Sequence, residues 1–206
     1  MSQMSIFLTG ATGYVGSVVA QKLQESGHKV IGLARNDTAI AKLQEHNIEP
    51  YLGDLSEPEN LIRIAREVDG VIHTAFNHDF SNFAKAVQIE RNIVAAFTDA
   101  LEDSGKPLIT SQGTAYLGDT GNLLANEETP YSTASDFSVF AMRAKAEQEA
   151  LGAAQRGIRS IALRLPHFVY GRAGSVFVPF LLQAARQTGV AHYIGAGENK
   201  LVVINM

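Results

Sequence analysis

Cysteine and tryptophan are absent from the 206 residues of this chain, and so is any long run of apolar residues. Without cysteine neither a disulfide framework nor a thiolate metal site can form, and a reducing compartment is compatible with this composition. No segment approaches the roughly 20 consecutive apolar residues of a membrane span. The start, MSQMSIFLTG, lacks a basic region followed by a long apolar run, which predicts no signal peptide. We therefore expect a soluble, cytoplasmic protein that does not associate with membranes.

Clustered positive charge is missing as well. The chain has 17 Lys and Arg residues against 21 Asp and Glu residues, a formal net charge of −4, and no basic run. Proteins that follow the phosphates of nucleic acid need a basic surface, so we expect no nucleic-acid partner. Hydrophobic residues, by contrast, make up 46% of the chain. That fraction suits one compact core, and we expect a single domain over residues 1–206.

Short apolar or β-branched runs alternate with longer helical patterns from end to end. Strands are predicted at 5–9, 29–34, 48–52, 70–75, 107–111, 159–165 and 190–194. Helices are predicted around Val15, Val18, Val19 and Leu23, and over 37–46, 57–67, 80–103, 133–155 and 175–187. This alternation predicts an α/β fold, a Rossmann-like doubly wound parallel sheet with helices on both faces. The connection at 112–132 is long, and loops of that length are usually functional.

A glycine-rich turn, SIFLTGATGYVGS, joins the first strand to the first helix. Gly10 allows a tight turn, Gly13 allows backbone amides to approach a diphosphate, and Gly16 allows close packing of helix on strand. The start of the helix then offers free N–H groups and a positive dipole end. Such a turn directly after the first strand of a βαβ unit predicts dinucleotide binding. The expected contacts come from Gly10, Thr12, Gly13, Tyr14, Val15 and Gly16.

The end of the second strand indicates which dinucleotide is preferred. An acidic residue there would bind the ribose hydroxyls of NAD, whereas an arginine accommodates the 2′-phosphate of NADP. The strand ends in GLARND, which places Arg35 and Asn36 at that position, and Asp37 follows where it could cap the next helix. Arg35 is alternatively a plain surface charge. The pattern favours NADP, with NAD as the alternative.

Several motifs in order resemble those of the extended short-chain dehydrogenase/reductase family, the NAD(P)-dependent epimerase/dehydratase group. They are TGATGYVG (9–16), GLAR (32–35), GDL (53–55), HTAF (73–76), TSQGTAYLG (110–118) and RLPHFVYG (164–171). The resemblance covers nearly the whole chain and is specific to the fold rather than to a substrate. It implies cofactor contacts by Asp54, Leu55, Thr74, Ala75, Phe76, Ser111, Lys145, Pro166 and His167. GDL is alternatively an ordinary turn at a strand end.

The family's chemistry rests on a Ser or Thr, a Tyr and a Lys, with Tyr and Lys four residues apart on one helix face. This chain departs from the pattern, because Ala141 stands four residues before Lys145. An apolar stripe predicts that Ala141 packs inward. The stripe consists of Phe137, Phe140, Ala141, Ala144, Gln148 and Leu151. Lys145 either reaches the cofactor ribose or pairs with Glu149 on a solvated face, where Arg143 would pair with Glu147.

Other groups are candidates for the missing acid. Thr114 lies close to the family's catalytic hydroxyl, although Gly113 occupies the stricter alignment. His167 is a candidate because imidazole as a group can donate or accept a proton near neutral pH and because this residue would lie at the nicotinamide end, with a buried, hydrogen-bonded histidine as the alternative. Tyr116 and Tyr131 lie in the long loop, but no spacing fixes either side chain. The catalytic candidates are therefore Thr114, Lys145 and His167. His73 and His78 have no acidic cluster beside them, so we expect no metal site.

The chain stops just after LVVI (201–204), where family members continue into a smaller substrate-binding lobe. We expect that lobe to be short or missing, either through truncation or because another subunit supplies the wall. An exposed apolar end favours a homodimer. The leading hypothesis is an NADP-dependent oxidoreductase acting on a carbonyl or alcohol of a small molecule. A non-catalytic NADP-binding sensor and a non-redox isomerase or lyase are the alternatives.

Overall fold

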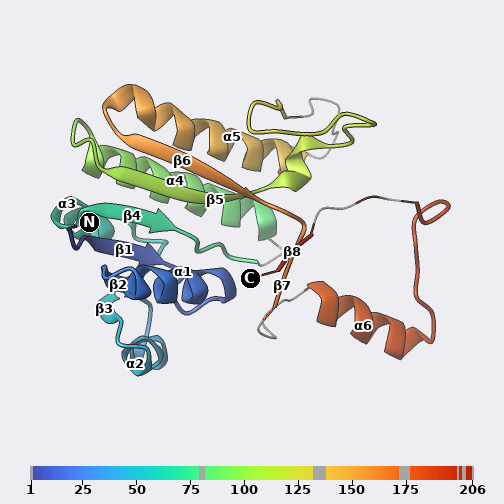
Figure 1. Ribbon diagram of the computed structural model, residues 1–206, viewed down its shortest axis with the longest axis horizontal. Helices are drawn as coiled ribbons and strands as arrows, with labels where there is room; N and C mark the ends of the chain where they lie inside the picture. The colour runs from blue at the N-terminus through green and yellow to red at the C-terminus, as the bar shows by residue number, and fades with distance from the viewer. Residues whose placement is uncertain are drawn as a thin grey trace.

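The computed structural model describes residues 2–78, 82–131, 138–171, 177–198, 200 and 203–205. Its centre is a six-stranded parallel sheet in the order β3-β2-β1-β4-β5-β6 (Figure 1). The strands are β1 Ser5–Thr9, β2 Lys29–Ala34, β3 Glu49–Leu52, β4 Gly70–His73, β5 Pro107–Gly113 and β6 Arg159–Leu165. This order confirms the expected Rossmann-like, doubly wound arrangement.

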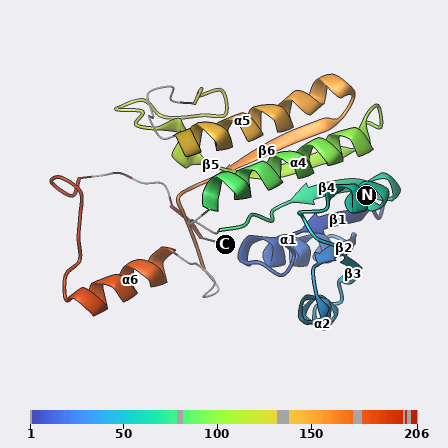
Figure 2. The same cartoon turned by 180° about the vertical axis from the view of Figure 1, so that it is seen from behind.

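Helices cover both faces of the sheet, as Figures 1 and 2 show from opposite sides. The helices are α1 Tyr14–Glu25, α2 Asp37–Glu45, α3 Ile62–Glu67, α4 Phe83–Leu101 and α5 Ser138–Gly152. Short 3₁₀ turns lie at η1 Pro58–Leu61, η3 Thr114–Leu117 and η4 Ala153–Arg156. One face carries α1 and α2, and the other carries α3, α4 and α5.

Alternation along the strands explains why the sheet is buried on both faces. Phe7 of β1 packs into a cluster with Leu61, Phe97 and Leu108, on the side of α3 and α4. Its neighbour Leu8 packs into a second cluster with residues of α1 and α2. Successive strand residues point to opposite faces, so one apolar run supplies both cores.

The C-terminal part is built differently. Strands β7 Phe168–Tyr170 and β8 Val203–Asn205 form a separate two-stranded parallel sheet. Helix α6, Phe177–Thr188, has no buried residue and extends away from the main sheet in both views (Figures 1 and 2). Its apolar side chains, including Phe180 and Leu181, are exposed. This region therefore adds little to the core that holds the main sheet.

Most predicted elements are confirmed, and three strands have the predicted bounds, 5–9, 29–34 and 159–165. The predicted strand at 190–194 is wrong, because this segment has no strand pairing and its Tyr193 side chain is exposed. Its apolar residues have no neighbouring strand to pair with. The short strand β7 was not predicted from the sequence. The long connection begins later than expected, since β5 continues to Gly113.

Candidate active site

The first site element is the turn between β1 and α1, where close packing requires glycine. Gly10 has φ +77°, and a Cβ there would lie 2.7 Å from Thr74 Oγ1 and 2.8 Å from the Ala75 nitrogen. A Cβ on Gly16 would lie 2.1 Å from the Gly10 carbonyl oxygen, which no backbone could accept without moving. The turn therefore brings bare backbone to the carboxyl ends of β1 and β4.

The first turn of α1 offers unpaired amides at this place. Gly13 is the N-cap residue and has no side chain to accept a hydrogen bond, and the first turn contains no acidic residue. Among the described residues, no acceptor takes the backbone N–H of Tyr14, Val15 or Gly16. Free N–H groups and the positive helix end suit an anion, so the residues fit a dinucleotide diphosphate.

At the end of β2, the side chains of Arg35 and Asn36 have different roles. Arg35 is exposed. Asn36 is the N-cap of α2 and accepts a 2.9 Å hydrogen bond from the Ala39 nitrogen. The expectation that Asp37 caps α2 is therefore wrong, since Asn36 comes first and Asp37 lies in the first turn. Asn36 retains its amide NH₂ group for other contacts.

A second cation reaches the glycine-rich turn from α2. Lys42 Nζ donates a 3.0 Å hydrogen bond to the carbonyl oxygen of Thr12. The sequence did not single out this lysine. Its contact with the turn before α1, from the second turn of α2, is visible only in the folded chain. Lys42 thus adds positive charge near the amides of α1, while Arg35 lies at the end of β2.

Asp54 and Leu55 follow β3, where Asp54 forms the strand-end turn that was the alternative interpretation of GDL. Asp54 Oδ1 accepts hydrogen bonds from the Ser56 nitrogen at 2.8 Å and the Ser56 hydroxyl at 2.6 Å, which closes a turn. These bonds lower the pKa of Asp54, and the positive charge of Arg35 adds to the effect. Leu55 packs against the core beside α3. Asp54 and Arg35 are both exposed and follow neighbouring strands, and the charge of Arg35 therefore acts on the Asp54 carboxylate.

The segment after β4 lies directly against β1. Thr74 Oγ1 donates a 2.8 Å hydrogen bond to the Thr9 carbonyl, and the Ala75 nitrogen lies 3.4 Å from Thr9 Oγ1. The Phe76 ring lies under the guanidinium of Arg143, with 4.2 Å from Cζ to the ring centroid. These contacts fix Thr74 and Ala75 beside the glycine-rich turn, and Phe76 against Arg143 of α5.

Two predicted catalytic residues come together at the ends of β5 and β6. Thr114 Oγ1 lies 3.4 Å from His167 Nδ1, although 53 residues separate them in the chain. His167 is exposed, so the alternative of a buried histidine is wrong. Pro166 precedes it at the end of β6. Ser111 Oγ instead donates to the His73 carbonyl at 3.3 Å.

Lys145 and Ala141 lie on the exposed side of α5. The predicted inward stripe is therefore wrong for Ala141, Gln148 and Leu151, which are exposed, while Ala144 is buried. Phe137 lies outside the described residues, and so does the Phe140 side chain. The helix turns its alanines at 144, 146 and 150 inward, because these small side chains let it pack closely. The position of the usual tyrosine, Ala141, is consequently exposed.

Lys145 is available for a ligand. Among the residues that the structure describes, Lys145 Nζ forms no hydrogen bond or ion pair. The expected partner Glu149 is held by both Arg91 Nε at 2.8 Å and Arg91 Nη2 at 2.6 Å. Arg91 of α4 is therefore the ion-pair partner of Glu149, since it offers a bidentate contact that a lysine cannot match, and Lys145 acts on this carboxylate only through its charge, which helps to lower the pKa of Glu149.

The opposite side of α5 is buried and charged, which contradicts the predicted solvated pairing of Arg143 with Glu147. Arg143 is 5% exposed and forms an ion pair with Glu90 of α4. Its Nε donates a 3.1 Å hydrogen bond to the Tyr116 hydroxyl. Burial lowers the pKa of Arg143 to about 10, while the negative charge of Glu147 opposes that shift. Arg143 thus remains a cation at neutral pH beneath the site.

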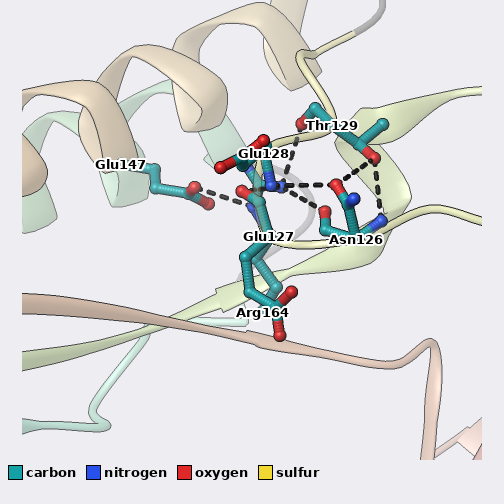
Figure 3. Close-up of polar contacts among 6 residues, drawn as sticks. All are labelled: Asn126, Glu127, Glu128, Thr129, Glu147 and Arg164. Carbon is teal, nitrogen blue, oxygen red and sulfur yellow. Dashed lines mark hydrogen bonds and ion pairs between the residues drawn. The ribbon is translucent and has the colours of Figure 1, made fainter.

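Glu147 has its partner on β6 and thereby anchors the long loop. Arg164 Nε donates to Glu147 Oε1 at 2.9 Å (Figure 3). Arg164 Nη1 also approaches the carbonyl oxygens of Asn126, Glu127 and Thr129, at 3.5, 3.3 and 3.0 Å. The Arg164 guanidinium further lies 5.0 Å from the centroid of the Tyr131 ring. One arginine therefore fixes the loop against the sheet.

No pattern in the sequence indicates that Arg143 and Arg164 are site residues. Both are charged, and the spacing of Arg143 and Glu147 is typical of an exposed helical ion pair. The one hint is that alanines rather than large apolar residues surround them on α5. Tyr116 was named as a loop residue, and the structure adds the partner that fixes it.

The described part of the chain contains no group of three His, Cys, Asp or Glu side chains able to hold a metal ion. His73 is 1% exposed and lies 2.6 Å from Thr9 Oγ1 through Nδ1, which accounts for it as a core residue. None of the helices described is long and apolar enough to cross a bilayer.

Comparison with known proteins identifies relatives of this chain. The model of the NAD dependent epimerase/dehydratase family matches residues 6–200. The chain is 38% identical over 206 residues to the uncharacterized protein YLL056C of Saccharomyces cerevisiae, covering 98% of this chain and 66% of that protein. It is 29% identical over 208 residues to 2-alkyl-3-oxoalkanoate reductase of Stenotrophomonas maltophilia, covering 96% of this chain and 60% of that protein.

A solved structure shows the same fold. The dTDP-glucose 4,6-dehydratase of Bacillus anthracis, in complex with NAD, matches with a TM-score of 0.75 at 19% identity. The match covers 98% of this chain and 67% of that chain. This chain spans less than two thirds of the length of the curated relatives named above.

Proposed function

Because the chain belongs to the NAD dependent epimerase/dehydratase family, we propose that it is an NADP-dependent oxidoreductase acting on a carbonyl or alcohol group of a small organic molecule. One observation carries the proposal. The bare backbone at Gly10 and Gly16 and the free amides of α1 form an anion cradle, and Lys145 of α5 is a separate, exposed cation. This combination suits a dinucleotide whose phosphates and distal ribose need separate partners.

NADP rather than NAD is proposed because of the charges near the cradle. Arg35 stands at the end of β2, where an acidic residue would repel a 2′-phosphate. Lys42 adds a second cation at the glycine-rich turn through its contact with Thr12. A phosphate with two negative charges is stabilised by such donors, whereas the ribose hydroxyl of NAD gains little from them.

The remaining residues have separate roles in the proposed reaction at the substrate carbonyl. A bound nicotinamide ring supplies or accepts a hydride at C4. Thr114 orients the substrate oxygen, Lys145 holds the ribose, and the proton that reduction places on the oxygen comes from His167 or from water. His167 suits this role because it is exposed and lies 3.4 Å from Thr114 Oγ1. Ser111, Pro166 and Phe76 then line the cofactor.

The substrate class proposed first is a 3-oxo acid. The reductase from Stenotrophomonas maltophilia, a relative at 29% identity, is named for 2-alkyl-3-oxoalkanoates. Such a molecule offers a ketone for reduction and a carboxylate that a nearby cation can bind. The exposed position of Lys145 and the loop fixed by Arg164 would form two sides of its site.

A non-catalytic NADP-binding regulatory protein is the second candidate. The observation that favours it is the exposed Ala141, which stands four residues before Lys145, where the family has its catalytic tyrosine. A protein of this kind would keep the anion cradle and would need no side chain that donates a proton to a substrate. The two candidates therefore share the cofactor and differ in turnover.

Two measurements test these proposals together. Fluorescence titration with NADPH and NADH measures both affinities, and we expect tighter binding of NADPH. NADPH oxidation is then followed with acetoacetate and with a panel of ketones and aldehydes. Binding with turnover supports the oxidoreductase, and binding without turnover supports the regulatory protein. Failure to bind either dinucleotide would overturn both.

A further inference from the structure

A hydroxyl group lies beside Gly113 although that residue has no side chain. Gly113 ends β5 with φ −126° and ψ 148°, an extended conformation that any residue can adopt. A Cβ built on Gly113 would lie 3.5 Å from the Tyr116 hydroxyl oxygen. A serine hydroxyl at position 113 and the Tyr116 hydroxyl would therefore occupy neighbouring places. The next residue, Thr114, carries the hydroxyl that approaches His167.

Arg143 fixes the Tyr116 hydroxyl in this position. Arg143 Nε donates to the Tyr116 oxygen at 3.1 Å, and its Nη2 lies 3.5 Å from the Ser111 carbonyl. The ion pair with Glu90 and the contact with the Phe76 ring hold the rest of the guanidinium. Because Arg143 is nearly inaccessible, the phenol cannot swing freely as a loop residue would.

We propose that the Tyr116 hydroxyl, held by Arg143, donates a hydrogen bond to the substrate oxygen and replaces the side chain absent at Gly113. This inference rests on the proposed oxidoreductase function. It adds a catalytic residue to Thr114 and His167, and it needs no transfer of the Tyr116 proton. The phenol holds the negative charge that develops on the oxygen while His167 or water delivers the proton.

The electrostatic setting suits a donor that stays protonated. The hydrogen bond from Arg143 uses a lone pair of the Tyr116 oxygen and does not consume the phenolic proton. Burial, together with the negative charge of Glu147, raises the pKa of Tyr116 to about 12. A neutral phenol polarised by a neighbouring cation is a strong hydrogen-bond donor in a partly buried site.

The test compares the purified protein with Tyr116→Phe and with Gly113→Ser/Tyr116→Phe. Tyr51→Phe is the matched control, because the Tyr51 hydroxyl donates to the Asn60 carbonyl at 3.0 Å on the β3 side of the sheet. Acetophenone labelled at its carbonyl is bound in the presence of NADP⁺, which cannot reduce it. Infrared spectroscopy then reports the carbonyl stretch, which falls when the oxygen accepts a hydrogen bond. NADPH affinity is measured in parallel for every variant.

We expect Tyr116→Phe to raise the stretching frequency of the bound carbonyl toward the value that it has in a solvent without hydrogen-bond donors. The NADPH affinity should be unchanged. In the double variant the serine hydroxyl should lower the carbonyl frequency again to that of the parent protein. Tyr51→Phe should have the same frequency as the parent protein. With acetoacetate, Tyr116→Phe should lower kcat about a hundredfold and leave KM nearly constant. A carbonyl stretch that does not respond to Tyr116→Phe would overturn the inference. Loss of dinucleotide binding in the parent protein would instead overturn the proposed function.

Discussion

Arg164 of β6 and Glu147 of α5 form a 2.9 Å hydrogen bond between side chains that are 16% and 1% exposed (Figure 3). The carboxylate of Glu147 is thus held away from water and depends on its partner. The same guanidinium reaches three carbonyl oxygens of the long loop, including that of Thr129 at 3.0 Å. A single buried pair therefore joins the core of the α5 face to the wall of the candidate site.

Replacing Arg164 with Met should lower the free energy of unfolding by about 3 kcal/mol, because Glu147 would be left buried without a partner. Urea denaturation measures this change. Limited proteolysis should also cut the loop near Thr129 faster. Arg159→Met is the matched control, since Arg159 begins the same strand and is exposed. A loss in Arg164→Met no larger than in the control would contradict the role of the pair.

Ala141→Tyr places a phenol on the exposed side of α5, four residues before Lys145. We expect NADPH-dependent reduction of acetoacetate to rise about a hundredfold, because the helix then supplies a general acid beside the lysine. Steady-state kinetics measures the gain. Gln148→Tyr, also exposed on α5, should give none. An unchanged rate in Ala141→Tyr would show that the proton is already delivered efficiently by other groups.

Arg35→Asp should exchange the preference between the two dinucleotides. Removing the cation and adding a carboxylate at the end of β2 should weaken NADPH binding about tenfold to a hundredfold relative to NADH. Fluorescence titration of both cofactors gives the ratio. Arg159→Asp makes the same charge change at the amino end of β6, and its ratio should stay that of the parent. Equal ratios in both variants would exclude Arg35 from cofactor selection.

His73 should make the free energy of unfolding depend on pH. Burial, with a smaller effect of the Arg143 charge, lowers the pKa of His73 from 6.5 to about 3. Between these pH values only the unfolded chain binds the proton, so stability falls as pH falls, by at most about 1.4 kcal/mol per pH unit. His73→Phe should flatten this slope, whereas Thr9→Val, which keeps the histidine buried, should preserve it. Urea denaturation at several pH values measures the slope for each variant. Equal slopes in the two variants would refute the role of His73.

The sheet and the cradle were predictable because local chemistry determines them. The run SIFLT supplies a strand with both faces apolar, and Gly10 and Gly16 are required by contacts that a Cβ would block. The strand and the turn are each recognised from residues that are neighbours in the sequence, although Thr74 and Ala75, which a Cβ on Gly10 would meet, are distant in the chain. They follow from periodicity and from the conformational freedom of glycine.

The buried face of α5 was not predictable, because its partners are distant in the chain. Arg143 and Glu147 have the spacing of a surface pair, but Glu90 and Arg164 compete for them across the core. A buried ion pair is rare enough that charge normally indicates exposure. The apolar stripe through Ala141 was misplaced for the same reason: the charged side chains took the inward positions.

The central claim is that the first turn of α1 binds a dinucleotide diphosphate through its backbone, and NMR titration tests it most directly. On addition of NADPH, the amide resonances of Tyr14, Val15 and Gly16 should shift together and saturate with one dissociation constant. The Gly105 amide, which bonds to the Gly157 carbonyl at the other end of the sheet, should not move. Unchanged resonances for these three amides at millimolar NADPH would contradict the account.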